Sequence, residues 1–318
     1  MFDVTSMGEL LIDFTSCGKA DSGSRLFAQN PGGAPANVAV AVSRLSGKAA
    51  FIGKVGNDMH GRFLKETLEE NKVNCDALIL DDGYFTTLAF VDVDENGERE
   101  FSFARKHGAD KMLTKDELEL ELIKNSKIFH FGSVSLTDEP VRSATLYAAE
   151  FAEKHGVTVS YDPNYRASLW DSEEKAVAEM RNALKFADLV KISDEETFLL
   201  TGETDYIKAA EKLIADGTTI AVVTLGKNGA YICTKDYALT VDGFDADAID
   251  CTGAGDAFWG GFLTKLCKSG KTVGSLTNKE LYSFTRYANA VASICVERNG
   301  AIPSLPDVNE AEERFCRK

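Results

Sequence analysis

The sequence is poor in the residues that build metal centres and disulfide frameworks. Its 318 residues include four histidines, without the spacing of metal ligands, and seven scattered cysteines with no Cys-x-x-Cys pair. Structural zinc sites and disulfide scaffolds need such clusters, so both are disfavoured. An odd number of scattered cysteines also favours a reducing compartment, and we expect a cytoplasmic protein.

Long apolar runs and an excess of positive charge are missing as well. No apolar stretch approaches the length of a membrane span, and Met1-Phe2-Asp3-Val4 lacks the basic head of a signal peptide. The net charge of −15 argues against nucleic acids and anionic membranes as partners. An anionic nucleotide would therefore have to be attracted locally, by helix ends, a few basic side chains or bound cations.

What the chain does contain is an alternation of strand-like and helical segments, which is typical of an α/β fold. We expect a three-layer α/β/α sandwich around a largely parallel sheet. The expected strands cover residues 2–14, 50–52, 127–131, 157–161, 188–192 and 219–224. The expected helices cover residues 36–45, 139–155, 173–186, 205–215 and 278–298, and one more runs from a capping box at Thr114-x-x-Glu117 to Ile123.

One stretch departs from this alternation. Residues 86–93 and 99–103 alternate apolar and polar side chains around Asp94-Glu95-Asn96-Gly97, which predicts a β-hairpin. A hairpin does not easily join a parallel core, so we expect a small β-lid built from residues 14–31 and 84–106. The main domain would then comprise residues 1–13, 32–83 and 107–318. The lid is also the expected interface of a homodimer.

The most informative motif lies at residues 250–261, Asp-Cys-Thr-Gly-Ala-Gly-Asp-Ala-Phe-Trp-Gly-Gly. The small residues Thr252-Gly253-Ala254-Gly255 precede an apolar helical pattern, so successive N–H groups can hold an anion at the helix N-terminus. Asp256 would lie beside that anion and could take a proton from an attacking hydroxyl. Taken alone, an aspartate in a first helical turn is more often a capping residue. The spacing does not match a Rossmann or a Walker fingerprint.

A second small-residue loop, Asn30 to Asn37, also opens a helix. Its glycines would let a ligand approach the backbone, and the Asn37 amide can both donate to hydroxyls and accept from them. A plain turn with a helix cap explains this loop equally well. Asp13, Asp162 and Thr224 are expected at the carboxyl ends of strands, where open α/β sheets bind ligands. Asp13 could accept hydrogen bonds from a vicinal diol, or it could be an ordinary loop acid.

Together the two loops resemble the paired signatures of ribokinase-like (PfkB-type) sugar kinases. The resembling segments are Gly32 to Asn37 and Asp250 to Asp256, and the likeness covers essentially the whole chain. Within that family the chain is most similar to bacterial fructokinases. This closer similarity depends on Gly97-Glu98-Arg99-x-Phe101-x-Phe103-x-Arg105, Gly108-Ala109-Asp110, Asp162-Pro163-Asn164-Tyr165-Arg166 with Leu169-Trp170, and Gly300-Ala301-Ile302-Pro303.

The resemblance implies a ribokinase-like fold, ATP and Mg²⁺ as cofactors, and a role for each matching residue. Asp256 would be the base, and Gly253, Ala254 and Gly255 the anion hole. The implied sugar ligands are Asp13, Gly32, Gly33, Asn37, Phe103, Arg105 and Arg166. The implied nucleotide ligands are Lys191, Thr224, Gly226, Gly229, Gly253, Gly255 and Asn289. Glu196 would organise Mg²⁺ through water, and Asp250 and Thr252 would lie near a K⁺ site.

Two positions depart from the family pattern. Ser193 stands where many members carry Asn, ahead of Glu196, and His107 replaces a proline that is common in fructokinases.

The activity that the resemblance implies is ATP-dependent phosphorylation of a ketohexose, with D-fructose giving fructose 6-phosphate. A 2-keto-3-deoxygluconate kinase is the alternative, in which Arg105 or Arg166 would hold a carboxylate. A catalytically silent sugar sensor on the same fold is a third reading, although an intact Asp256 argues against it. Fructose is favoured because Phe101, Phe103 and Ala104 make the lid near Arg105 less polar than a carboxylate site requires.

Overall fold

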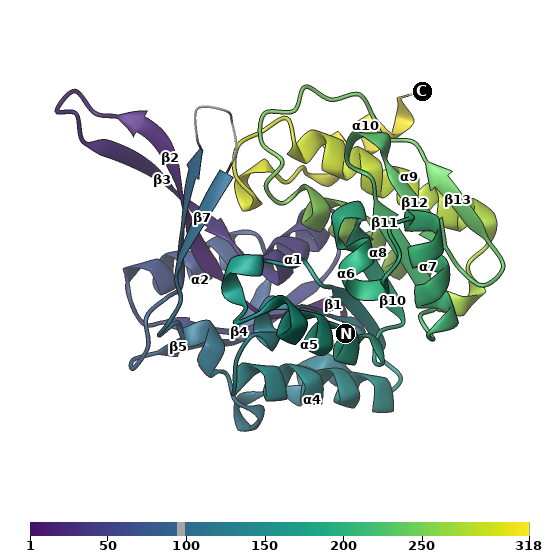
Figure 1. Cartoon of the computed structure of the whole chain (residues 1–318), viewed down its shortest axis with the longest axis horizontal. Helices are drawn as coiled ribbons and strands as arrows, with labels where there is room; N and C mark the ends of the chain where they lie inside the picture. Colours follow the sequence, from purple (N-terminus) through teal and green to yellow (C-terminus); the bar gives the residue numbers. More distant parts are fainter. Residues whose placement is uncertain (94–98, 318) are drawn as a thin grey trace.

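The computed structural model describes residues 1–93 and 99–317. In this part of the chain, nine strands form a large sheet in the order β13-β12-β11-β10-β9-β8-β1-β4-β5 (Figure 1). All neighbours are parallel except the β11–β12 and β12–β13 pairs. The strands are β1 (Phe2–Met7), β4 (Ala49–Gly56), β5 (Asn74–Asp81), β8 (Ser126–Gly132), β9 (Thr158–Asp162), β10 (Leu189–Ser193), β11 (Ile220–Thr224), β12 (Ala230–Cys233) and β13 (Ala238–Val241).

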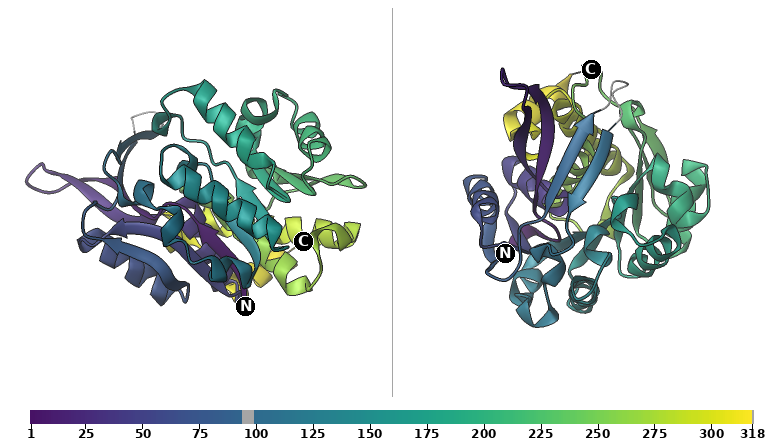
Figure 2. Two further views of the ribbon diagram at one scale, coloured as in Figure 1. Left: turned by 90° about the horizontal axis from the view of Figure 1, so that it is seen from below. Right: turned by 60° about the vertical axis from the view of Figure 1, so that its left-hand side comes forward.

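Helices cover both faces of this sheet and bury one hydrophobic cluster on each (Figure 2). The first cluster packs against α1 (Ala34–Arg44), α2 (Met59–Glu70), α8 (Ala254–Ser269), α9 (Asn278–Cys295) and α10 (Val308–Cys316). The second packs against α3 (Leu120–Lys124), α4 (Val141–Lys154), α5 (Glu173–Leu184), α6 (Thr197–Thr201) and α7 (Tyr206–Ala215). The expected three-layer α/β/α architecture is confirmed. None of the described helices has the length and apolar character needed to cross a membrane.

A separate four-stranded sheet projects from one edge of the molecule (Figure 1). Its order is β3-β2-β6-β7, with strands β2 (Leu11–Lys19), β3 (Arg25–Gly32), β6 (Leu88–Val93) and β7 (Arg99–Ala104). We call it the lid sheet. Strands β2 and β3 extend beyond the expected lid segment 14–31, because Leu11 to Asp13 pair with Asn30 to Gly32. The hairpin turn expected at residues 94–97 lies outside the described residues.

Two expectations about local structure are wrong. The single strand expected over residues 2–14 is two strands, β1 and β2, which belong to different sheets. Asp13 therefore lies near the start of β2 in the lid sheet and not, as expected, at the carboxyl end of a strand. The first strand ends just before Gly8. The φ of Gly8, 154°, is readily adopted only by glycine, and a Cβ there would lie 2.6 Å from Pro35 Cγ. The helix expected from Thr114 to Ile123 is a 3₁₀ turn (Lys115–Glu117) followed by the short α3. The capping box of Thr114 and Glu117 is present, but it caps the turn.

The lid sheet is anchored to the main domain by two carboxylates. Asp58 accepts from the N–H and hydroxyl of Thr86, immediately before β6 (both 2.8 Å). Asp110 accepts from Thr87 Oγ1 (2.5 Å) and from Arg105 Nε (2.7 Å), immediately after β7. The hairpin therefore enters and leaves the main domain through fixed points, and its orientation over the large sheet is set by charged hydrogen bonds.

A buried polar group lies between the large sheet and α8. Ser160 Oγ on β9 accepts from Trp259 Nε1 on α8 (2.8 Å) and lies 3.0 Å from His130 Nδ1 on β8. Burial, aided by the charge of Lys191, lowers the pKa of His130 to about 3. His130 is therefore neutral in the folded protein across the physiological range.

This buried histidine should weaken the fold in acid. An unfolded histidine takes a proton near pH 6.5, so stability falls as the pH drops from there towards 3. Between pH 7.5 and pH 5 the wild type should lose about 2 kcal/mol more unfolding free energy than His130→Gln. Urea unfolding of both proteins at the two pH values measures this difference. Equal losses would mean that His130 does not titrate on unfolding.

Candidate active site

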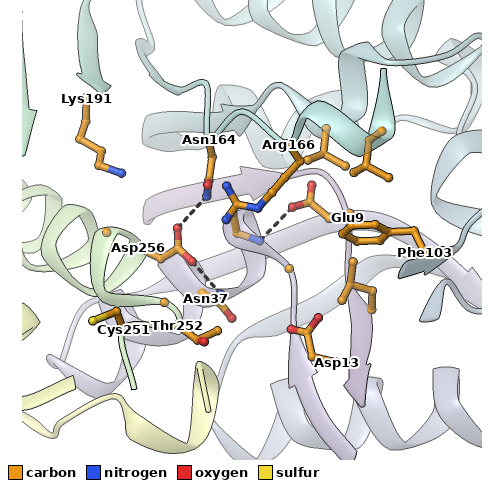
Figure 3. A pocket seen from close by; sticks show the side chains of 17 residues that line it. Glu9, Asp13, Asn37, Phe103, Asn164, Arg166, Lys191, Cys251, Thr252 and Asp256 are labelled. Atoms are coloured by element: carbon orange, nitrogen blue, oxygen red, sulfur yellow. Dashed lines mark hydrogen bonds between the residues drawn. The ribbon is translucent and has the colours of Figure 1, made fainter. Parts of the chain in front are cut away.

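Two adjoining cavities lie beside the N-terminus of α8, and residues of the lid sheet line the first of them. We call the first the lid-side cavity; it has a volume of about 390 Å³. It is lined by Glu9, Leu11, Asp13, Gly33, Ala34, Asn37, Phe103, Val134, Asn164, Arg166, Leu169, Lys191, Cys251, Thr252, Gly253, Gly255 and Asp256 (Figure 3). The second, the α9-side cavity, has a volume of about 520 Å³ and includes Thr224, Gly226, Gly229 and Asn289. Cys251 and Gly255 line both cavities.

Asp256 lies in the first turn of α8 and is 5% exposed. Its Oδ2 accepts from Asn37 Nδ2 at 2.7 Å, and its Oδ1 accepts from Asn164 Nδ2 at 3.2 Å. Figure 3 shows the two amides approaching the carboxylate from different elements, α1 and the loop after β9. Burial raises the pKa of Asp256, whereas the charges of Lys191 and Arg166 and the Asn37 hydrogen bond oppose the rise. Two amides thus fix the orientation of a buried carboxylate.

The glycines before Asp256 allow a close approach at the start of α8. Gly253 has a φ of 77°, and a Cβ at Gly255 would lie 2.7 Å from Lys191 Nζ. Lys191 is itself paired with Asp162, Nζ to Oδ2 at 2.7 Å, and both side chains are buried. Burial alone would lower the pKa of Lys191, but Asp162, Glu196 and Asp256 raise it. A lysine cation and a helix N-terminus therefore converge on one point, which suits a phosphate oxygen.

Carboxylates and unpaired acceptors line the other end of the lid-side cavity. Burial raises the pKa of Asp13 to about 7 and that of Glu9 to about 7. Glu9 Oε1 accepts from Ala34 N–H at 2.9 Å, while Glu9 Oε2 and Asn37 Oδ1 are buried without a partner among the described residues. Buried acceptors without partners are costly unless a ligand donates to them. This end of the cavity therefore suits a ligand rich in hydroxyl groups.

The α9-side cavity follows the ends of β11 to β13. Asn289 donates both amide hydrogens to the carbonyls of Val241 and Asp242, at 2.9 and 3.0 Å. Gly229 has a φ of 91°, and a Cβ there would collide with the Val241 carbonyl. The cavity is open along the Gly226 loop and meets the lid-side cavity at Cys251 and Gly255. A nucleotide in this cavity would point its phosphates at the N-terminus of α8.

Most of the predicted site residues come together around these cavities, and four do not line either of them. Arg105 is 5% exposed, and it donates to Asp110, to Thr137 Oγ1 (2.7 Å) and to the Val134 carbonyl (3.0 Å). Its guanidinium thus holds the base of the lid sheet. Gly32 packs against the Asp13 carboxylate, with which a Cβ would collide. The sequence analysis placed Arg105 in the sugar site because the motif that ends at Arg105 does not show which groups its guanidinium binds.

Glu196 and Asp250 are the other two residues outside the cavities. Glu196 Oε2 accepts from the N–H and hydroxyl of Ser193, at 2.8 and 3.1 Å, and Glu196 Oε1 accepts from Tyr165 N–H at 2.7 Å. Asp250 also holds backbone: its oxygens accept from Thr252 N–H (2.8 Å) and Gly300 N–H (2.9 Å). Among the described residues, no group of three His, Cys, Asp or Glu side chains could hold a metal ion.

The sequence analysis assigned no role to Glu9 and Asn164, whose polar side chains line the lid-side cavity. Glu9 follows Gly8 at the break between β1 and β2, and this break is not visible as long as residues 2–14 are treated as one strand. Asn164 comes two residues after Asp162, the last residue of β9. Because ligands bind at the carboxyl ends of such strands, this position could have identified Asn164 from the sequence.

Comparison with known proteins agrees with this geometry. Residues 1–308 match the profile of the pfkB family carbohydrate kinases. Fructokinase-2 of Oryza sativa subsp. japonica is 44% identical over 319 residues, which span 99% of this chain and 94% of the relative. The fructokinase of Xylella fastidiosa with bound ATP has a TM-score of 0.91 at 32% identity, covering 99% and 98% of the two chains. The fructokinase of Vibrio cholerae O395 in its fructose, ADP and calcium ion bound form has a TM-score of 0.89 at 34% identity, covering 98% of each chain. With a family match that spans nearly its whole length, this chain belongs to the pfkB family of carbohydrate kinases.

Proposed function

We propose that this protein is an ATP-dependent fructose kinase that forms fructose 6-phosphate. The observation that carries the proposal is the position of Asp256. Its buried carboxylate lines the lid-side cavity. The preceding residue, Gly255, lines both cavities, so Asp256 lies next to the point where the lid-side and α9-side cavities meet. A base is useful for phosphoryl transfer only at such a junction. The fructokinase names of the relatives support fructose as the acceptor.

In the proposed mechanism, the sugar lies in the lid-side cavity. Asp13, Asn37 and the backbone at Gly33 bind its hydroxyl groups, Phe103 covers it from the lid sheet, and Arg166 closes the cavity beside Asn164. Asp256 accepts the proton of the hydroxyl that attacks the γ-phosphate. Holding the acceptor in this geometry replaces a collision in water with an intramolecular step, which contributes several kcal/mol to the rate enhancement.

The phosphate side is proposed to use the N-terminus of α8. The N–H groups of Gly253, Ala254 and Gly255 stabilise charge on the transferred phosphoryl group, and the Lys191 ammonium adds a fixed positive charge beside Gly255. ATP would extend from there into the α9-side cavity, past Thr224, Gly226 and Gly229, with its base near Asn289. Closure of the cavity by the lid sheet would exclude water, which competes with the sugar as acceptor.

The residues present suit a metal ion that enters with the nucleotide. Mg²⁺ bound to ATP neutralises charge on the phosphate oxygens. Both Glu196 oxygens already accept hydrogen bonds from protein donors, so we assign this residue to the water shell of the metal. Asp250 and Thr252 remain our candidates for a K⁺ site. They lie in the loop that leads to the anion hole, and Asp250 shapes that loop.

The charges in the lid-side cavity favour a neutral acceptor over a sugar acid. Arg105 is committed to Asp110 and Thr137, so a substrate carboxylate would depend on Arg166. The described lining includes three carboxyl groups, those of Glu9, Asp13 and Asp256. The Lys191 charge is paired with Asp162. A substrate carboxylate would therefore be repelled by the ionised fraction of the three carboxyl groups, whereas fructose, which is neutral, would not be.

We also propose that the protein forms a homodimer through the outer face of the lid sheet. Phe14, Phe27 and Phe90 form an aromatic cluster there, with the Phe14 and Phe90 rings stacked at 5.3 Å and His60 of α2 against Phe14. Phe90 is 38% exposed. Burial of these rings against a second copy would remove apolar surface from water.

The seven unpaired cysteines support our expectation of a reducing, cytoplasmic compartment.

The base assignment is tested by Asp256→Asn. The amide cannot accept the hydroxyl proton, so kcat should fall roughly 10²–10⁴-fold while the affinity for ATP changes little. Steady-state kinetics together with calorimetric titration of ATP would measure both. A variant that keeps most of its turnover would reduce Asp256 to a helix-capping residue.

The acceptor is tested by direct competition between fructose and 2-keto-3-deoxygluconate. We expect kcat/KM for fructose to be higher by on the order of 10²-fold or more, since the acid finds no unpaired arginine other than Arg166 in the described lining. Phosphorus NMR of the product should show phosphate on the 6-hydroxyl. The opposite ratio would assign the protein to the sugar-acid kinases and leave the role of Asp256 intact.

The dimer is tested by sedimentation velocity. The wild type should sediment as a dimer at micromolar concentration, and Phe90→Ser should shift it towards the monomer because the exposed ring is lost. A surface change far from the lid, Tyr282→Ser, serves as the control, since Tyr282 is 41% exposed on α9. A monomeric wild type would overturn the proposal.

A further inference from the structure

Asn164 is the least expected neighbour of Asp256. It lies in the loop after β9, and its Nδ2 donates to Asp256 Oδ1 at 3.2 Å (Figure 3). The other oxygen of the same carboxylate accepts from Asn37. Asn37 comes from the first turn of α1, which binds sugar in our proposal, whereas Asn164 comes from the opposite side of the cavity. The carboxylate is thus held between two amides that no part of α8 supplies.

The backbone of Asn164 has an unusual conformation. Its φ of 47° is in the left-handed region, which asparagine tolerates better than most residues with a side chain. Among the described residues, only Ser46 and Lys72 share a positive φ without being glycine, and both follow the C-terminal end of a helix. A left-handed residue in a loop costs conformational energy, and such strain is often retained at functional sites.

Neighbouring residues hold this conformation from both sides. The Pro163 carbonyl accepts from Ser133 N–H at 3.1 Å. On the other side, Tyr165 N–H donates to Glu196 Oε1 at 2.7 Å, and Glu196 is in turn bound by Ser193. The amide of Asn164 therefore has little freedom to leave Asp256. Hydrogen bonds thus connect the end of β10 to the backbone of the loop after β9, and the same loop is bonded to the Asp256 carboxylate through Asn164.

We propose that Asn164 is a positioning residue that fixes the Asp256 carboxylate for proton abstraction and keeps it ionised. The proposal rests on the proposed role of Asp256 as the base. An amide donor stabilises the charged form of a carboxylate and opposes the effect of burial. Without it the carboxylate could rotate about its terminal torsion, which is broad and weakly restrained. Asn164 acts on the reaction through Asp256 and is assigned no bond to the reacting atoms.

Other charged or titratable groups also face Asp256, and they are the same in all the variants below. They are Lys191 on β10, Arg166 after β9, Asp162 at the end of β9, Asp13 on β2 and Cys295 on α9.

The test uses Asn164→Gly and Asn164→Asp in the full-length protein. Glycine keeps the left-handed conformation and removes the amide, whereas aspartate keeps the shape and replaces the donor with a carboxylate. We expect kcat to fall about 10-fold in Asn164→Gly and on the order of 10²-fold in Asn164→Asp, with KM for fructose and for ATP changed less than about threefold. Lys72→Gly is the matched control, a left-handed position outside both cavities, and should leave kinetics unchanged.

The pH profile separates positioning from a purely structural role. Activity requires ionised Asp256, so it is lost as the pH falls through the pKa of that carboxyl group. Removal of the amide raises this pKa, and the acidic limb of kcat should move to higher pH, by about one unit in Asn164→Gly and by more in Asn164→Asp. Thermal melts identify any variant that fails to fold, and fructose binding by calorimetry remains a readout for folded variants.

Three results would overturn the inference. An unshifted acidic limb with reduced kcat would make Asn164 structural, and a large rise in fructose Kd with normal kcat would make it a binding residue. Wild-type kinetics in Asn164→Gly would remove it from the site. If Asp256→Asn retains activity, the proposed base itself fails, and that outcome is independent of the Asn164 variants.

Discussion

The burial of one carboxylate is the constraint on which the site depends. Asp256 has little contact with water, so its ionised form must be stabilised by the protein. Asn37, Asn164, Lys191 and Arg166 provide this stabilisation, and they come from separate parts of the chain. Each of them is fixed by its own partner or backbone. The large sheet, with its strands ending at one edge, is what brings these segments together.

Few positive charges lie at the edge of the large sheet where the cavities are, and Lys191 is paired with a carboxylate. The chain has a net charge of −15, so attraction of ATP cannot come from the overall field. We propose that it comes from the N-terminus of α8 and from Lys191, whose ammonium reaches Gly255 only because glycine has no side chain. Asp162 holds that lysine in place at 2.7 Å. Local dipoles and one oriented cation thus replace a basic surface.

The residues that could be predicted from the sequence are those whose function depends on local backbone. Gly253, Gly255 and Asp256 lie in one short segment, and their spacing alone places donors beside a carboxylate. The order of helices and strands was also predictable, because apolar periodicity is a local property. The break at Gly8 was not, since it depends on a close approach to Pro35 from another segment. For the same reason Glu9 was missed.

Arg105 and Arg166 show where such prediction ends. Both arginines belong to motifs shared with fructokinases, and the sequence supports a sugar-binding role for either. Their partners differ: Arg105 lies within 2.7 Å of Asp110 and Thr137, whereas Arg166 lines the cavity. A buried arginine needs most of its donors satisfied, and Arg105 donates to Asp110, Thr137 and Val134 without lining either cavity, so it is not placed to bind a substrate carboxylate. Its role is to fix the lid sheet, which brings Phe103 over the cavity. Arg105 thus acts on the cavity through the lid sheet, without lining it.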